Sequence, residues 1–262
     1  MVSQISPKDL VEVRFLHRPP MKILKRSIFH QSLVKERCKY FDKAISVFKC
    51  ESIEAHVIGS IARGDSDPYS DIDLWFTFDD ADISNVLEIR NELFAQIGEV
   101  VHVCEPPQNR PPNGIQSSVL IKTVAGLLVL DISLCPKSSA YSIKEAKKIF
   151  GDIVLPESTM GYNPQKVTVD DLYRIDFVIL FVFGAIKKIV RKEAGACNSL
   201  IEQYGYLYQK YNIEVDPFIN MDNKYDTIRQ VIVNLIKVSN DKQKKALSEV
   251  ESFLNVVETL ED

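Results

Sequence analysis

Alternation of apolar and polar residues marks the first half of the chain and predicts a β-sheet. Strands are predicted at 53–59, 71–78, 99–103, 115–124 and 127–134. The last two form a hairpin around Ala125-Gly126. Apolar residues at helical spacing predict a helix over 27–49 that covers the sheet, and 82–97 and 142–150 are also predicted to be helical.

The second half of the chain has the helical period throughout. Helices are predicted at about 169–193, 196–211, 223–238 and 241–259. The first of them is apolar nearly all round between Phe177 and Ile186, so we expect it at the centre of a bundle. Pro, Gly, Ser and Asn gather in 156–164 without periodicity. The chain is therefore predicted to be α+β, with a sheet domain over 1–155 and a helical domain over 165–262.

Composition narrows the class of protein. A chain of 262 residues with 45% hydrophobic and 26% charged residues is long enough for two packed domains. Its start lacks the basic-then-apolar pattern of a signal peptide, and its longest apolar run is too short to span a bilayer. Five cysteines without Cys-x-x-Cys spacing favour free thiols. We therefore expect a cytoplasmic protein that does not enter membranes.

Charge is spread unevenly along the chain. Residues 1–50 hold eleven Lys/Arg and four Asp/Glu, whereas residues 51–110 hold three Lys/Arg and thirteen Asp/Glu. An acidic surface repels a polynucleotide and attracts a cationic small molecule, so nucleic acid is disfavoured as a partner. A solvated acidic loop and helix face remains the alternative explanation of the acidic block.

Two carboxylates open the strand predicted at 71–78. Its Ile72, Leu74 and Phe76 fall on one face, and Asp71 and Asp73 fall on the other, which we expect to be open. Residues two apart on a strand lie roughly 6.5 Å apart, so the two carboxylates can converge on one cation. Oxygen ligands beside a phosphate substrate favour magnesium.

The residues before this strand have the character of a phosphate-binding turn. The strand at 53–59 ends in Gly59-Ser60, where a short helix would present backbone N–H groups and a hydroxyl. Glycine lets a phosphate approach the backbone closely. Arg63 is placed to reach the outer phosphates of a triphosphate.

A third acid lies in the strand predicted at 127–134. Its even-numbered leucine and isoleucine positions share one face, and Asp131 falls on the other. If this strand pairs beside 71–78, the three carboxylates can hold two metal ions about 3.5–4 Å apart, as in-line attack on phosphorus requires. An aspartate at a strand end, turned to solvent, is the alternative.

Together these residues resemble the DNA polymerase beta-like nucleotidyltransferase superfamily. The elements are Gly59-Ser60, then Asp71-Ile72-Asp73, then Asp131 on a later strand. The form Gly-Ser-x-x-Arg-Gly followed by Asp-Pro-Tyr-Ser-Asp-Ile-Asp resembles its antibiotic-modifying branch, which includes aminoglycoside and lincosamide nucleotidyltransferases.

The resemblance implies a mixed sheet with flanking helices, two Mg²⁺ ions, and ATP or another nucleoside triphosphate as co-substrate. The implied metal ligands are Asp71, Asp73 and Asp131, and the implied nucleotide-binding residues are Gly59, Ser60, Arg63 and Ser70.

The resemblance also implies a general base in the helical domain. Asp176 lies near the line of Leu172, Ile179 and Phe183, within an apolar face. It is therefore either poised toward the active cleft as the base or neutralised in a buried salt bridge. The candidate partners for neutralisation are Arg174, Tyr173 and Lys187. Glu193 is the second candidate, as a base or substrate-binding residue, with a solvated helix end as its alternative.

Three functions remain open at this point. The first is transfer of a nucleoside monophosphate, AMP above all, to a hydroxyl of a small molecule such as an aminoglycoside or lincosamide antibiotic. The second keeps the chemistry but uses RNA or a protein side chain as acceptor, as in toxin-type or tRNA-modifying relatives. The third is a non-catalytic nucleotide-binding module. The sequence leaves the acceptor, the preferred triphosphate and the oligomeric state undetermined.

Overall fold

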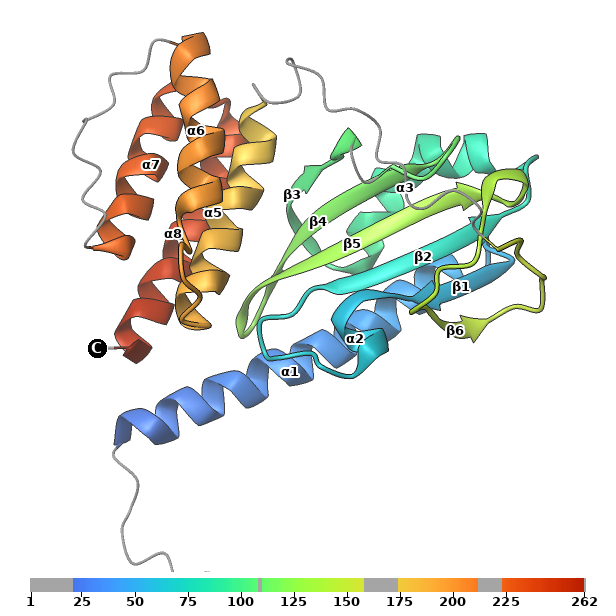
Figure 1. Cartoon of the computed structure of the whole chain (residues 1–262), viewed down its shortest axis with the longest axis horizontal. Coiled ribbons are helices and arrows are strands. Elements are labelled where there is room, and N and C mark those ends of the chain that lie inside the picture. Colours follow the sequence, from blue (N-terminus) through green and yellow to red (C-terminus); the bar gives the residue numbers. More distant parts are fainter. Residues whose placement is uncertain (1–20, 108–109, 158–173, 212–222, 262) are drawn as a thin grey trace, which may run out of the picture.

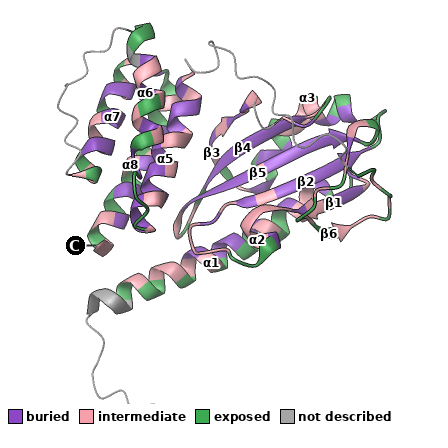
Figure 2. Ribbon diagram, viewed as in Figure 1, coloured by how far each residue is buried: buried purple, intermediate pink, exposed green. Residues whose placement is uncertain are grey.

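A computed structural model describes residues 21–107, 110–157, 174–211 and 223–261. It has three parts: a long N-terminal helix, a twisted sheet and a bundle of helices beside the sheet (Figure 1). The sheet strands are largely buried, and the exposed residues gather on the outer sides of the helices (Figure 2). The fold is α+β, with an N-terminal sheet domain followed by C-terminal helices, as predicted.

Six strands form one mixed sheet in the order β3-β4-β5-β2-β1-β6. Their bounds are β1 Glu54–Val57, β2 Ile72–Phe78, β3 Glu99–Cys104, β4 Ile115–Thr123, β5 Gly126–Pro136 and β6 Lys147–Phe150. The β2–β5 pair is parallel, and the other four pairs are antiparallel. The predicted hairpin at Ala125-Gly126 is therefore confirmed as β4–β5, and β2 lies beside β5 at the centre of the sheet.

One face of the sheet is covered by α1 (Met21–Phe48) and α3 (Ile83–Ile97). The core beneath them contains the apolar faces predicted for β2 and β5. These residues are Ile72, Leu74, Phe76, Phe78, Leu128, Leu130, Ile132 and Leu134. Phe48 of α1 stacks on Phe76 with 4.6 Å between ring centroids. The side chains of alternate residues therefore point away from this core, to the other face of the sheet.

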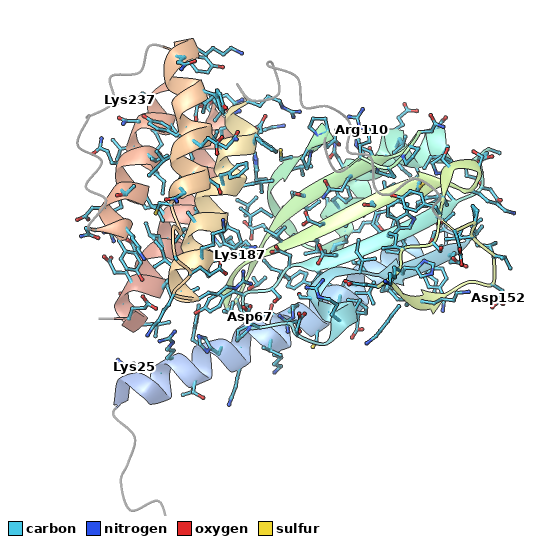
Figure 3. All side chains as sticks on the ribbon, viewed as in Figure 1. Lys25, Asp67, Arg110, Asp152, Lys187 and Lys237 are labelled. Atoms are coloured by element: carbon cyan, nitrogen blue, oxygen red, sulfur yellow. The ribbon has the colours of Figure 1, made fainter. Side chains whose placement is uncertain are left out.

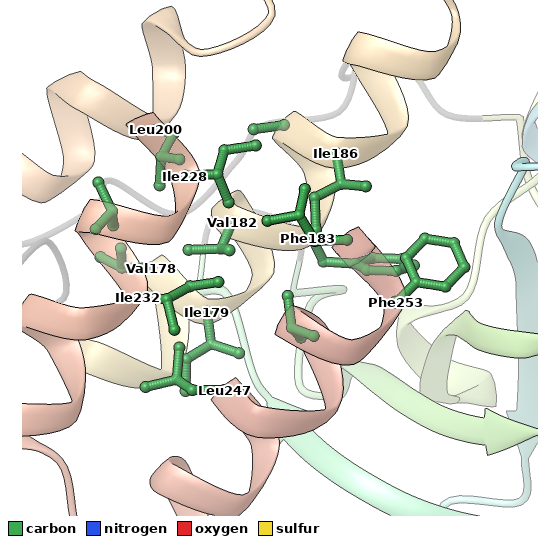
Figure 4. Packing of buried hydrophobic residues seen from close by; sticks show 14 of the residues in the cluster. Val178, Ile179, Val182, Phe183, Ile186, Leu200, Ile228, Ile232, Leu247 and Phe253 are labelled. Atoms are coloured by element: carbon green, nitrogen blue, oxygen red, sulfur yellow. The ribbon is translucent and has the colours of Figure 1, made fainter. Parts of the chain in front are cut away.

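The bundle consists of α5 (Ile175–Val190), α6 (Asn198–Tyr211), α7 (Lys224–Val238) and α8 (Asp241–Glu261). Most residues of α5 are buried, which confirms its predicted central position. Val178, Val182 and Ile186 of α5 pack against the other helices (Figure 4). Leu127 and Val129 of β5 belong to the same core. The bundle is thus packed directly on the sheet face that carries the odd-numbered residues of β5.

Two sequence predictions about the sheet domain are wrong. Residues 142–150 do not form a helix: β6 ends this segment and pairs with β1 at the sheet edge. The face of β2 opposite the main core is not open along its whole length, because Trp75 and Thr77 are buried there. Trp75 packs against Tyr141 with 5.4 Å between ring centroids. The open part of this face is therefore confined to the end of β2 that begins with Asp71.

The predicted boundary at 156–164 falls mostly outside the described residues, so the division into 1–155 and 165–262 stays a prediction. No helix in the described ranges is long and apolar enough to cross a membrane. The five cysteines are all free thiols.

Candidate active site

Asp73 and Asp131 are directly opposite each other on the parallel strands β2 and β5. Paired residues on parallel strands point to the same face, and this face is the one opposite the α1–α3 core. Ser118 of β4 is in turn opposite Asp131, and its hydroxyl donates to the Asp131 carboxylate. Gln116 Nε2 donates to the same oxygen at 3.1 Å. The three strands thus place Asp73, Asp131 and Ser118 in one row, and Gln116 reaches Asp131 from two residues earlier on β4.

The surroundings of both carboxylates disfavour their ionised forms. Burial is the largest cause that raises the pKa of Asp73 to about 7, and repulsion from Asp131 and Asp71 adds to it. Burial also raises the pKa of Asp131 to about 6, with repulsion from Asp71 next, against the stabilising hydrogen bond from Ser118. A cation placed between the carboxylates would relieve this repulsion.

Gly59 lies against Asp73 at the junction of β1 and the short helix α2 (Gly59–Arg63). Its φ is +67°, in the left-handed region that favours glycine. A Cβ atom on this residue would lie 2.2 Å from Asp73 Oδ2. The Ile58 N–H donates to the Asp73 carbonyl at 3.0 Å, which ties the two strand ends together. Glycine is therefore required here by conformation and by space.

The Ser60 hydroxyl, next to Gly59, has no hydrogen-bond partner within the described residues. Arg63, at the other end of α2, is exposed and pairs with Asp65 at 3.2 Å and Glu145 at 3.5 Å. These two partners are themselves exposed, so Arg63 can leave them for another anion with little loss of free energy.

Asp71 precedes β2 and faces the bundle. Lys187 Nζ of α5 lies 2.6 Å from Asp71 Oδ1 and 2.7 Å from Oδ2. Lys187 is buried, and its ammonium also lies 5.3 Å from the centroid of the Phe183 ring. Lys187 was one of three candidate partners for Asp176, and in the structure it pairs with Asp71 instead.

The loop before Asp71 is fixed by Asp67. Arg191, just after α5, donates from Nε to Asp67 Oδ2 at 2.6 Å and from Nη2 to Oδ1 at 3.0 Å. Arg37 of α1 donates to the Asp67 carbonyl. Ser70 is buried, and its hydroxyl donates to Asp67 Oδ1 at 3.1 Å. In this structure Ser70 therefore shapes the loop; its predicted contact with nucleotide stays a prediction. Lys187 and Asp67 lie where the bundle meets the sheet (Figure 3).

Asp176 lies at the opposite end of α5 from Lys187, the partner of Asp71. It lies in the first turn of α5, about 16 Å along the helix axis from Lys187 at 1.5 Å per residue. Its Oδ1 accepts from Gln243 Nε2 at 2.9 Å, and its carbonyl oxygen lies 2.9 Å from His102 Nε2. Within the described residues, the partners of Asp176 are Gln243 and His102 rather than Arg174 or Lys187. Tyr173, the third candidate, lies outside the described residues, and the role of Asp176 as general base stays a prediction.

Glu193 is exposed and lies just beyond α5, with Oε1 3.9 Å from Arg191 Nη1. Because Arg191 forms an ion pair with Asp67, Glu193 is on the same side of the bundle as Asp71. Of the two helical-domain acids, Glu193 is therefore the one at the loop that leads into the site.

Sequence reasoning missed four residues of this site: Lys187, Arg191, Ser118 and Gln116. In the sequence, Lys187 is a lysine near the end of an apolar helix, and such a lysine is ordinarily interpreted as a charge that flanks the apolar segment. The polar run Gln116-Ser117-Ser118 inside a buried strand was a second signal, because buried polar side chains need partners.

The acidic triad (Asp71, Asp73 and Asp131) has the donor chemistry that Mg²⁺ requires. Burial and repulsion between the carboxylates raise the pKa of Asp73 and of Asp131, so a cation bound between them would favour their ionised forms. The arrangement is not a closed metal centre: within the described ranges no three His, Cys, Asp or Glu side chains converge as metal ligands. Asp71 would have to exchange Lys187 for the ion.

The fold and the triad define a class: a mixed-sheet α+β protein with acidic residues on adjacent central strands, beside a Gly-Ser turn. Comparison with known families agrees, since residues 32–105 match the family model described as "Nucleotidyltransferase domain". The match covers less than a third of the chain; it includes Gly59, Ser60, Asp71 and Asp73 and ends before Asp131. No curated protein matches the chain. The similarity supports a transferase.

Proposed function

We propose that this protein transfers a nucleoside monophosphate, AMP above all, from a nucleoside triphosphate to a hydroxyl of a small molecule. The observation that carries the proposal is the Asp73–Asp131 pair on adjacent parallel strands, with Gly59-Ser60 packed against Asp73. In the reaction, the acceptor oxygen bonds to the α-phosphorus, the bond from that phosphorus to the bridging oxygen breaks, and pyrophosphate leaves. The hydroxyl proton passes to a carboxylate base.

The residues that would hold magnesium are Asp71, Asp73 and Asp131. Bound there, Mg²⁺ would neutralise the triphosphate and lower the pKa of the acceptor hydroxyl. The chain's own contribution is to hold Asp73 and Asp131 in one row by strand pairing and to restrain Asp131 through Ser118 and Gln116.

Gly59 and Ser60 would receive the triphosphate. The absence of a side chain on Gly59 leaves room beside Asp73, and the Ser60 hydroxyl is free to donate. Arg63 would leave its two exposed acidic partners for the departing pyrophosphate, where charge develops. Ser70 would act by keeping the Asp67 loop in place.

Glu193 is our preferred general base, and Asp176 is the second choice. The preference rests on Arg191, which links Glu193 to the loop of Asp67. Asp176 is engaged by Gln243, at the opposite end of α5 from Lys187. A base must come within hydrogen-bond reach of the proton it removes, so we rank the two acids by their position.

An aminoglycoside, a lincosamide or another hydroxylated small molecule is the proposed acceptor. RNA is disfavoured, since the block from 51 to 110 is strongly acidic. A protein hydroxyl remains the second candidate acceptor, because Asp71, Asp73 and Asp131 would serve the same reaction on it.

The test is pyrophosphate release with Mg²⁺ and each of the four ribonucleoside triphosphates, against a panel of aminoglycosides, lincosamides, phenols and polyols. We expect release that depends on acceptor and is lost on addition of EDTA. Asp131→Asn is the matched control, because it keeps the size of the side chain and the acceptor role of one oxygen. Equal pyrophosphate release by Asp131→Asn and the wild-type protein would refute the proposal.

A further inference from the structure

A pocket of about 260 Å³ lies between α5, α6 and the sheet, beside the acidic triad. Its walls are mainly apolar, from Phe177, Leu180 and Phe181 of α5 and Leu200 of α6. Phe177 and Phe181 form an edge-to-face pair with 5.0 Å between centroids. An apolar wall with a few polar groups is typical of a small-molecule site.

Ser118 connects this pocket to the triad. It lines the pocket and also donates its hydroxyl hydrogen bond to Asp131. No other residue that lines the pocket hydrogen-bonds to a triad carboxylate within the described part of the chain. A molecule in the pocket is thus one side chain away from the carboxylate row.

One charged residue is among the described residues that line the pocket. Lys188 lines it, half-buried, and its ammonium has no ion pair or hydrogen bond among the described residues. Its neighbour Lys187, about 100° further around the helix, is turned to Asp71 instead. None of the described residues that line the pocket is acidic. Among these described lining residues, a cationic group would meet the ammonium of Lys188 and no carboxylate.

We propose that this pocket binds the acceptor, and that the acceptor is a hydroxylated molecule with an apolar body and one negatively charged group. The inference rests on the proposed transfer reaction. The apolar body packs between Phe177, Phe181 and Leu200, the negative group pairs with Lys188, and the hydroxyl points past Ser118 toward Asp131. This chemistry selects against polycationic aminoglycosides.

Three probes with one body and different charges test the claim: 3-(4-hydroxyphenyl)propionate, its primary amide, and tyramine. Binding to the full chain without nucleotide is measured by calorimetry, with kanamycin as the polycation. We expect the carboxylate to bind more tightly than the amide, and the amide more tightly than the amine. Lys188→Met should weaken the carboxylate roughly fivefold, the value of a half-exposed ion pair, and leave the amide unchanged.

Gly184 of α5 offers a variant that fills the pocket. It lines the cavity, and a Cβ atom there would have no other atom within 4 Å. Gly184→Leu should abolish probe binding, while its helix propensity favours folding. The matched control is Gly205→Leu on α6, where a Cβ atom also meets open space but the residue does not line the pocket. Gly205→Leu should bind the carboxylate probe like the wild-type protein.

The outcomes separate this inference from the proposed function. Tyramine or kanamycin binding as tightly as the carboxylate would overturn it, as would unchanged probe binding in Gly184→Leu. Pyrophosphate release to an acceptor that is unaffected by Gly184→Leu would also overturn it, while the transfer function stands. If Gly184→Leu abolishes probe binding but no triphosphate gives pyrophosphate release, the pocket is a ligand site that does not bind the acceptor of a transfer reaction.

Discussion

Lys187 Nζ lies 2.6 and 2.7 Å from the two oxygens of Asp71, a residue 116 positions earlier in the chain. The contact joins the last turns of α5 to the entrance of β2. It also places a positive charge on the one triad carboxylate that is not hydrogen-bonded to Ser118 or packed against Gly59. A bound metal ion would compete with this ammonium for Asp71, so domain packing and metal binding use the same carboxylate.

Lys187→Met should therefore have two effects of opposite sign. It leaves Asp71 unpaired, so the free energy of unfolding without metal should fall by about 1–3 kcal/mol, less than for a fully buried pair because Asp71 keeps some solvent contact. It also frees Asp71 for a divalent ion, so the dissociation constant for Mn²⁺, measured by electron paramagnetic resonance, should fall. Urea unfolding supplies the stability measurement.

Lys188→Met is the control for this variant in both measurements. It removes a lysine from the next position of the same helix, but one without an ion pair in the described residues. We expect its unfolding free energy to stay within about 0.5 kcal/mol of the wild-type value. Equal Mn²⁺ affinity in Lys187→Met and Lys188→Met would contradict competition at Asp71.

Asp73→Asn should remove activity without unfolding the protein. The amide keeps the shape of the side chain but lacks the charge that a metal ion requires, so kcat should fall by at least about a hundredfold. Addition of Mg²⁺ and ATP should raise the melting temperature of the wild-type protein and leave that of Asp73→Asn unchanged. Pyrophosphate release and thermal unfolding give the two measurements; retention of wild-type activity would remove Asp73 from the mechanism.

The pH dependence of stability has a definite sign at Asp73. Its pKa is raised to about 7 in the folded state, so between about pH 4 and pH 7 the folded protein binds a proton that the unfolded chain has released. The contribution of this residue to the unfolding free energy therefore falls as pH rises through that window. Without metal, Asp73→Asn should be more stable than the wild-type protein at pH 8, and this gain should disappear toward pH 4.

The quantity to follow with pH is the difference in unfolding free energy between Asp73→Asn and the wild-type protein. Burial lowers the pKa values of His30, His56 and His102, and their contribution has the opposite slope with pH. These histidines are common to both proteins and cancel in the difference. A stability difference that does not change between pH 4 and pH 8 would contradict the raised pKa of Asp73.

Much of the site was predictable because strand periodicity is local. Alternation alone assigned Asp73 and Asp131 to the faces that they occupy, and the neighbouring apolar residues to the core. The Gly-Ser turn was predictable for a similar reason, since its conformation depends on adjacent residues. The pairing of β2 with β5 could be assumed but not predicted, because nothing in the sequence between these strands determines which strand pairs with β2.

The parts that could not be predicted depend on contacts between distant elements. Lys187 reads as a flanking charge until α5 is packed on the sheet, and then it meets Asp71. The segment 142–150 is short, and Lys147 and Lys148 at the exposed edge hide the alternation of a strand. The burial of Trp75 depends on the chain that follows β5, which contributes Ala140 and Tyr141.

The glycine that begins α2 and the glycine that follows it allow the effect of backbone strain to be measured separately from the effect of damage to the site. Gly59 and Gly64 both have positive φ, +67° and +87°. A Cβ atom on Gly59 would lie 2.2 Å from Asp73 Oδ2, whereas one on Gly64 would meet nothing within 4 Å. Alanine at either position should cost about 1–2 kcal/mol of stability through the left-handed conformation. Only Gly59→Ala should also displace the Asp73 carboxylate.

We therefore expect Gly64→Ala to keep most of the wild-type kcat, and Gly59→Ala to lose roughly a hundredfold, because a displacement of about 1 Å at a reacting group has an effect of that size. Urea unfolding checks that the two variants lose comparable stability, and pyrophosphate release measures the activity. The Asp73 contribution to the pH slope should also shrink in Gly59→Ala alone, since a displaced carboxylate is less buried and less strongly repelled by Asp131. Equal activity loss in both variants would mean that the turn, and not its contact with Asp73, is what the reaction requires.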